Sequence, residues 1–365
     1  MIRTFDYRSS LGEIEDEIRA ALDRVLRSGR LILGPETEAF EQEFAAFTGS
    51  RFCVGVTSGT TALHLALAAL DVGAGDEVIT VANTCPPTIS AIRLTGAVPV
   101  FVDVRADDLM MDADQIESRL SERTRCIVPV HLWGKSADLD SLEAVSKKHG
   151  IPIIEDCAQA HGTTWNARHV GTFGRMGCFS FYPTKNIGAY GDAGAIVTDD
   201  PDLDQRLRRL RMYGYEGSQV SLENGINGRI SEMQSAILRT KLRIYPQWLA
   251  RRLAVAAVYD AEITHPSVRK PSHGTSCRPS YHQYVIESDA RNQLAGHLRE
   301  RDIETGIHYA VPIHKMPAYR DLPGSRAALP ITEAACERIL SLPIHESLSP
   351  ESARVVSDAI NSFPS

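Results

Sequence analysis

Short apolar segments alternate with helical patterns over about the first 200 residues, and this alternation constrains the fold more than any other feature. Each apolar run has the length of a strand and is followed by apolar residues at helical spacing. Strands that alternate with helices predict an α/β fold with a mainly parallel sheet. We expect strands at residues 52–56, 77–81, 98–102, 126–129, 151–155, 178–181 and 195–198, with helices between them, one of these at 113–121.

The pattern changes after Trp248. A long helix begins at Ser231 with the spacing of a capping box, and we expect it to end near Pro246. Prolines then divide the chain into short segments around one strand (281–287) and one helix (293–301). We therefore predict a large domain over residues 1–245 and a smaller α+β domain over residues 246–365.

Composition and charge exclude several classes of function. The 365 residues carry a net charge of −7 and no basic run, which argues against binding to nucleic acid. No apolar run reaches about 18 residues, the length that a membrane span needs, and Asp6 interrupts the apolar start of the chain. The seven cysteines are scattered and form no C-x-x-C pair. A disulfide framework or a zinc site is therefore not expected, and the cytoplasm is the expected compartment.

Lys185 stands at the end of an apolar, aromatic strand. Pro183 fixes a turn just before it, and small or glycine residues follow. Most lysines are solvated surface charges, and that is the alternative reading here. Burial beside the strand would lower the pKa of this lysine and favour the neutral amine that forms imines. We therefore predict that Lys185 is a Schiff-base nucleophile.

A second cluster of polar residues lies 29 residues before Lys185, at the end of the apolar strand 151–155. Asp156 would be a helix cap or a loop acid if it stood alone. At the end of a buried strand it needs a cationic partner or hydrogen-bond donors. The protonated nitrogen of pyridoxal phosphate is such a partner. The amide of Gln159 would then reach the hydroxyl of the same ring.

A strand-to-helix turn at residues 58–62 has the composition of an anion site. Its small residues leave the first-turn amides of the helix free to face a phosphate. Gly59 and Thr60 would supply backbone N–H groups, and Ser180 would supply a hydroxyl from beside the lysine strand. An ordinary Ser/Thr helix cap has the same sequence. Together with Asp156 and Lys185, however, the turn predicts a site for pyridoxal phosphate.

Several motifs occur along the chain in a characteristic order: SGTTAL at 58–63, VPVHLWG at 128–134, EDCAQAHG at 155–162, SFYPTKN at 180–186 and GINGRISEMQ at 225–234. With them the chain resembles the DegT/DnrJ/EryC1/StrS family of pyridoxal-phosphate-dependent sugar aminotransferases over essentially its whole length. The resemblance implies the fold-type-I architecture, which is that of aspartate aminotransferase. It also implies a homodimer whose active sites lie at the subunit interface.

The resemblance also implies roles for individual residues. Lys185 would carry the cofactor and shuttle a proton, Asp156 would face the pyridine nitrogen, and Gln159 would lie beside the ring hydroxyl. The implied phosphate ligands are Gly59, Thr60, Ser180 and, for the cofactor of the neighbouring subunit, Asn227.

One position departs from the family pattern. Cys85 stands where an aromatic residue often stacks on the cofactor ring, so either the thiol provides a smaller contact or the stacking comes from elsewhere. We assign Cys85 to the cofactor site on this basis. Substrate contacts are expected from His308 and Tyr309, which lie in a proline-bounded loop, and from Arg229, for which a surface salt bridge is the alternative. No metal is expected, because no pair of histidines has helical i, i+4 spacing among the motif segments.

The expected reaction is a transamination. Glutamate or glutamine would give its amino group to the keto group of a nucleotide-linked deoxysugar, and Lys185 favours this over the dehydration that family members with histidine at this position perform. One alternative is amination of a keto-cyclitol such as an inosose, or the formation of an aromatic amine. A second is a non-enzymatic regulatory role. The complete set of Lys185, Asp156 and Gln159 and the lack of a basic segment argue against regulation.

Overall fold

The computed structural model describes residues 1–217 and 219–364, and one mixed sheet forms its centre. Parallel bridges between Ile127 and Ile153 and between Val130 and Asp156 join its two parts. The strands lie in the order β3 (Val98–Val102), β2 (Glu77–Val81), β4 (Thr124–Ile127), β5 (Ile154–Asp156), β8 (Met176–Ser180), β9 (Gly194–Thr198) and β1 (Phe52–Val56).

Neighbouring strands of this sheet are parallel except at β9, which runs antiparallel to both β8 and β1. The mainly parallel sheet is thus confirmed, and the bounds predicted for β1, β2 and β3 are the observed ones. Strand β5 is shorter than predicted and begins at Ile154. Because β9 reverses the direction, β1 runs parallel to β8. The carboxyl ends of β1, β2, β4, β5 and β8 therefore meet at one edge of the sheet, where α/β proteins place their sites.

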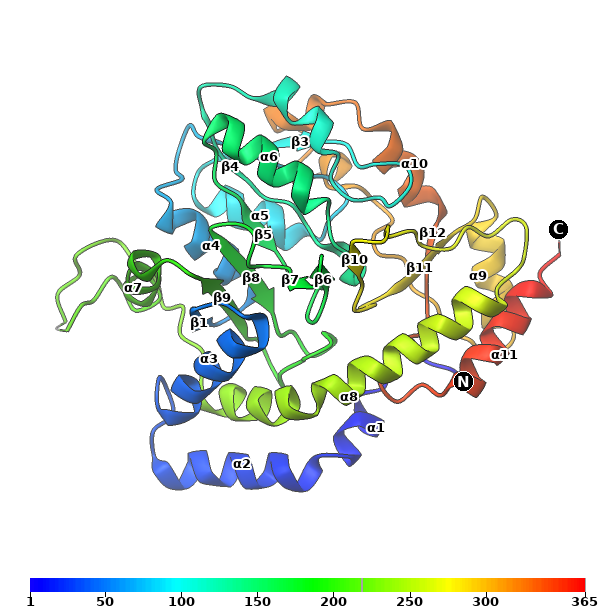
Figure 1. Cartoon of the computed structure of the whole chain (residues 1–365), viewed down its shortest axis with the longest axis horizontal. Coiled ribbons are helices and arrows are strands. Elements are labelled where there is room, and N and C mark those ends of the chain that lie inside the picture. Colours follow the sequence, from blue (N-terminus) through cyan, green and yellow to red (C-terminus); the bar gives the residue numbers. More distant parts are fainter. Residues whose placement is uncertain (218, 365) are drawn as a thin grey trace.

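Helices cover both faces of the sheet (Figure 1). Alternate strand residues face two different apolar clusters, as Val78 and Ile79 of β2 do. One cluster packs the sheet against α4 (Gly59–Ala69), α5 (Pro86–Leu94) and α7 (Pro201–Leu210). The other packs it against α3 (Pro35–Thr48), α6 (Leu139–His149) and the first half of α8 (Glu232–Glu262). Burial on both faces explains why these strands read as continuous apolar runs.

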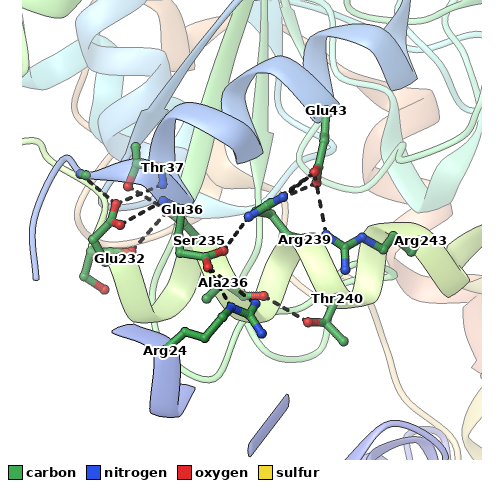
Figure 2. Close-up of polar contacts among 12 residues, drawn as sticks. Arg24, Glu36, Thr37, Glu43, Glu232, Ser235, Ala236, Arg239, Thr240 and Arg243 are labelled. Atoms are coloured by element: carbon green, nitrogen blue, oxygen red, sulfur yellow. Dashed lines mark hydrogen bonds and ion pairs between the residues drawn. The ribbon is translucent and has the colours of Figure 1, made fainter. Parts of the chain in front are cut away.

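A buried carboxylate joins α8 to α3 (Figure 2). Gly34 precedes α3 and has no side chain to cap it. Glu232 instead accepts hydrogen bonds from the backbone N–H groups of Gly34, Glu36 and Thr37, at 2.8–2.9 Å. Two turns further along, Arg239 donates to Glu43 and also to Glu36. This network fixes the start of α8, whose hydroxyl cap at Ser231 forms as predicted.

The predicted end of the long helix at Pro246 is wrong, because α8 continues through the proline to Glu262. A proline inside a helix costs about 3 kcal/mol. Tyr245, Trp248 and Arg252, which flank it, are all at most 2% exposed. Burying large side chains such as those of Tyr245 and Trp248 contributes about 1.5–3 kcal/mol each, so tertiary packing offsets the local cost.

The helix predicted at residues 113–121 is also wrong. Two short 3₁₀ turns, Ala113–Gln115 and Glu117–Arg119, take its place. The carboxylate of Asp112 accepts from the backbone N–H of Asp114 and from the side-chain amide of Gln115. The amide oxygen of Gln115 in turn accepts the N–H of Asp103. These side-chain bonds compete with the backbone bonds of a helix.

The C-terminal part of the chain packs around a separate apolar cluster that extends from Val255 to Ile360. The antiparallel pair β11 (Tyr284–Glu287) and β12 (Ile339–Leu342) lies there with α9 (Arg291–Arg299), α11 (Pro350–Asn361) and the second half of α8. Helix α8 connects this part with the central sheet (Figure 1). We propose the division at residue 245 on the basis of the separate cluster.

The remaining helices and strands lie outside the central sheet and the pair β11–β12. They comprise α1 (Tyr7–Gly12), α2 (Glu15–Ser28), α10 (Pro330–Arg338), and the small strands β6 (Thr164–Trp165), β7 (Arg168–His169) and β10 (Cys277–Arg278). Among the described residues, no helix combines the length and the apolar character that crossing a bilayer requires.

Candidate active site

A cavity of about 420 Å³ opens at the edge where the parallel strands end. The turns after β1, β2, β5 and β8 line it together with the segment around residue 308. The cavity brings together most of the predicted site residues: Gly59, Thr60, Cys85, Asp156, Gln159, Ser180, Lys185, His308 and Tyr309. Asn227 and Arg229 do not line it.

Lys185 reaches the cavity from a tight turn after β8. Its backbone N–H donates to the carbonyl of Tyr182 at 2.8 Å. The chain then doubles back so closely that a Cβ at Gly188 would lie 2.3 Å from the carbonyl oxygen of Pro183, so only glycine fits there. Burial lowers the pKa of Lys185, and the nearby Cys85 and Asp156 offset part of this effect. The turn thus presents an amine that loses its proton more readily than a surface lysine does.

Asp156 ends β5 and is 4% exposed. One carboxylate oxygen accepts from the Thr88 hydroxyl at 2.8 Å, and the other accepts from the N–H of Ala158 at 3.1 Å. Burial raises the pKa of Asp156, and these two donors oppose the rise. Within the described residues no ion pair is formed with this carboxylate. A buried acid that faces a cavity in this way suits a cationic ligand atom such as a pyridinium nitrogen.

The amide of Gln159 is held from both sides. Its oxygen accepts the backbone N–H of Trp133 at 2.8 Å. Its nitrogen donates to the hydroxyl of Tyr309 at 3.1 Å. The thiol of Cys85 also lies within hydrogen-bonding reach of that hydroxyl, and burial raises the pKa of the thiol. Tyr309 thus places an aromatic ring in the cavity beside Cys85, the position at which the family pattern often has an aromatic residue.

The start of α4 forms a close-fitting anion cradle. Ser58 caps the helix by accepting the N–H of Thr61 at 3.1 Å. The first-turn amides of Gly59 and Thr60 have no acceptor within their own helix. A Cβ at Gly59 would lie 2.6 Å from the Cβ of Ser180, so glycine alone allows the helix to start against the end of β8. The geometry suits the phosphate of the proposed cofactor.

Asn227 and Arg229 lie on the outer side of this cradle. The N–H of Thr57 donates to the carbonyl of Gly228 at 3.0 Å, which places the segment next to the turn. Arg229 donates to the Asn227 side chain at 3.0 Å, and its guanidinium lies 5.3 Å from the centre of the Tyr213 ring. Asn227 is exposed. Neither residue reaches the cavity of its own chain, so their roles stay predictions.

Sequence reasoning missed several residues of the site. The hydroxyl of Thr88 donates to Asp156. Its place in the sequence shortly after β2 could have indicated this contact, since β2 ends at the same edge of the sheet as β5. Tyr182 lines the cavity from the motif that contains Lys185 and is 52% exposed. His282 and Gln283 reach the cavity from the C-terminal part of the chain, and no local pattern indicates this.

Three buried side chains, His131, Glu155 and Cys157, place potential metal ligands within 4.8 Å of one another. Hydrogen bonds of His131 and Glu155 account for the positions of these two side chains. Nδ1 of His131 accepts the N–H of Ala137, so Nε2 carries the proton and donates to Glu155 at 2.9 Å. Glu155 also accepts the backbone N–H groups of residues 171, 173 and 174. The group therefore acts as a scaffold behind β5.

The position of the lysine, the acid and the helix terminus at one sheet edge is that of a fold-type-I transferase. The chain belongs to the DegT/DnrJ/EryC1/StrS aminotransferase family, whose model matches residues 12–361. It is therefore a transaminase, and the family is one of pyridoxal-phosphate enzymes.

Relatives share nearly the whole chain. The dTDP-3-amino-3,4,6-trideoxy-alpha-D-glucose transaminase of Streptomyces venezuelae is 41% identical over 98% of this chain and 95% of its own. The erythromycin biosynthesis sensory transduction protein EryC1 of Saccharopolyspora erythraea is 42% identical over 95% of both chains. The crystal structure of S. venezuelae DesV in complex with a ketimine intermediate is 41% identical, with a TM-score of 0.96 over 99% of this chain and 98% of that one.

Proposed function

We propose that this transaminase binds pyridoxal phosphate at Lys185 and aminates a keto group of a nucleotide-linked deoxysugar, with glutamate or glutamine as the donor. The observation that carries the proposal is the cavity itself, because Lys185, Asp156 and the start of α4 line it together. The S. venezuelae relative, named for a 3-amino sugar, supports amination at C3.

Each residue of the cavity has a distinct task. Bound pyridoxal phosphate supplies an electron sink for the carbanion that forms at the donor's Cα. Lys185 would anchor the cofactor covalently, and its amine, once released by the donor, would accept the proton from the donor's Cα and return it at the cofactor's C4′ carbon. Asp156 keeps the ring nitrogen protonated, because a buried carboxylate without an ion pair stabilises a cation beside it. Gly59, Thr60 and Ser180 hold the phosphate while the covalent anchor is exchanged.

We further propose a homodimer with shared active sites. Asn227 is exposed next to the phosphate cradle and does not line the cavity of its own chain. A second subunit placed against this surface would receive Asn227 near its own cofactor phosphate. Exchange of Asn227→Ala subunits with Lys185→Ala subunits tests the arrangement, since only shared sites give mixed dimers with one fully intact site.

Replacement of Lys185 tests the proposed function directly. Lys185→Ala should lose the visible absorption of the lysine-bound cofactor and all measurable turnover with glutamate and a dTDP-keto-sugar. Lys147→Ala is the matched control, because Lys147 is 76% exposed and pairs with Glu143 across one helical turn. Full turnover in Lys185→Ala would overturn the proposal.

The same assay separates the alternative functions. Turnover of a free inosose in place of the nucleotide sugar would assign the chain to cyclitol amination. The name of the EryC1 relative points to a regulatory role, and a colourless wild-type protein that takes up no pyridoxal phosphate would support that role for this chain.

A further inference from the structure

Trp133 lies directly behind the cavity and has no role in the chemistry described so far. It is 1% exposed and lies in the 3₁₀ turn Leu132–Gly134 that follows β4. Its φ of 60° is in the left-handed region, which is unfavourable for a bulky residue. Such a conformation persists only where the surroundings hold it strongly, and it often marks a functional constraint.

All three polar groups of Trp133 are hydrogen-bonded to residues that form or carry the cavity wall. The backbone N–H donates to the amide oxygen of Gln159 at 2.8 Å. The indole N–H donates to the carbonyl of His308 at 2.8 Å. The carbonyl accepts the N–H of Gln283 at 3.2 Å. One residue thus connects the end of β5 with two separate segments of the C-terminal part.

These hydrogen bonds form a closed network that includes Tyr309. Its backbone follows His308, which the indole of Trp133 holds, and its hydroxyl accepts from the Gln159 nitrogen. The backbone N–H of Trp133 requires an oxygen opposite it, so it fixes which end of the Gln159 amide is the oxygen. The nitrogen end then donates to Tyr309, and both residues line the cavity.

A second layer of contacts keeps Trp133 itself in place. The ammonium of Lys135 lies 5.2 Å from the centre of the indole ring and donates to the carbonyls of Asp108 and Ser272. Gly134 is packed so tightly that an added Cβ would lie 2.7 Å from the N of His282. The turn therefore packs closely against the backbone of residues 281 and 282.

We propose that Trp133 is a positioning residue, which sets the orientation of the Gln159 amide toward the cofactor ring and the position of Tyr309 against that amide. The proposal rests on the proposed binding of pyridoxal phosphate at Lys185. A donor held toward the ring hydroxyl stabilises its ionised form. If that donor is loosened, the ring oxygen becomes more basic. The proton shared between the ring oxygen and the nitrogen of Lys185 is then held more strongly, so its pKa rises.

The pKa of the visible absorption band of the wild-type holoenzyme is the readout. Trp133→Phe keeps the backbone N–H and most of the ring but removes the indole donor, which leaves the His308 carbonyl unpaired. Tyr309→Phe removes the hydroxyl on the other side of the amide. Each change should raise the pKa of the band by about half a unit or more. Because both act through one amide, the double variant should shift it no further than the larger single change.

Trp248→Phe is the matched control. Trp248 is 2% exposed, and its indole donates to Glu13 on the far side of α8 from the cavity. It should lower the thermal midpoint of the apoprotein as Trp133→Phe does, with no change in the band. Equal band shifts in the two tryptophan variants, or additive shifts in the double variant, would overturn the proposal.

The two proposals fail in different ways. A wild-type protein without a lysine-dependent band refutes pyridoxal phosphate binding, whereas a normal band that Trp133→Phe leaves unmoved refutes only the role of Trp133. If Trp133→Phe does not fold, Tyr309→Phe tests the proposal alone. An unchanged pKa of the band in that variant means that the Gln159 amide is not held through this hydrogen-bond network.

Discussion

Replacing Gly59 with alanine should weaken cofactor binding, because the added methyl group falls between the two sides of the phosphate cradle. The new Cβ would lie 2.6 Å from the Cβ of Ser180 and 3.2 Å from its Cα. Carbon atoms prefer a separation of about 3.5–4.0 Å. The first turn of α4 and the end of β8 must therefore move apart by roughly 1 Å. These are the two elements that we expect to hold the phosphate.

The expected magnitude follows from the cost of overpacking. Forcing an extra carbon into a filled site costs about 1–3 kcal/mol. If the protein relieves that strain by opening the cradle, the affinity for pyridoxal phosphate falls by about 5-fold to 150-fold. Titration of the apoprotein with pyridoxal phosphate, followed by quenching of tryptophan fluorescence, measures this loss.

Two further variants complete this experiment. Gly296→Ala in α9 is the control, since nothing lies within 4 Å of its added Cβ and alanine favours a helix. Gly59→Ala combined with Ser180→Gly removes the facing carbon and should recover part of the affinity, although the serine hydroxyl is lost. A folded Gly59→Ala protein with unchanged affinity would refute the assignment of the cradle to the phosphate.

Two other predictions concern titrating groups. Cys85 is the half-buried cysteine and the other six are buried, so iodoacetamide should modify Cys85 selectively in the native protein, and bound pyridoxal phosphate should protect it. Burial raises the pKa of Cys85, so labelling should be slow at neutral pH and faster in alkali. Equal labelling of several cysteines would contradict the structure. Lys241 is 5% exposed, and burial lowers its pKa to about 8. Its unfolded value is about 10.4, so between these values the unfolded chain binds more protons and this group raises stability as the pH rises. Lys241→Met should remove up to about 3 kcal/mol of that pH dependence, measured by urea unfolding between pH 7 and pH 10; identical slopes for wild type and variant would refute the low pKa.

Local patterns were sufficient for much of the fold. The strands β1, β2 and β3 are short, apolar and bounded by turns, and their predicted bounds are the observed ones. The prediction failed where the packing or the hydrogen bonds of side chains outweigh the local backbone preference. Pro246 would end an isolated helix, but the buried Tyr245 and Trp248 keep α8 continuous. Residues 113–121 carry a helical pattern, but the side-chain bonds of Asp112 divide them into 3₁₀ turns.

The amino-acid sequence was enough to predict that Lys185 and Asp156 follow buried strands and that a helix begins at Gly59. Parallel strands bring such positions to one edge, so the chemistry of the cavity could be inferred from neighbours in the chain. The contacts that hold these groups depend on the tertiary structure. Thr88 on Asp156, and Trp133 and Tyr309 on Gln159, are contacts between residues 26 to 150 positions apart. No local pattern encodes such pairs, because their geometry depends on how the sheet edge and the C-terminal segments pack together.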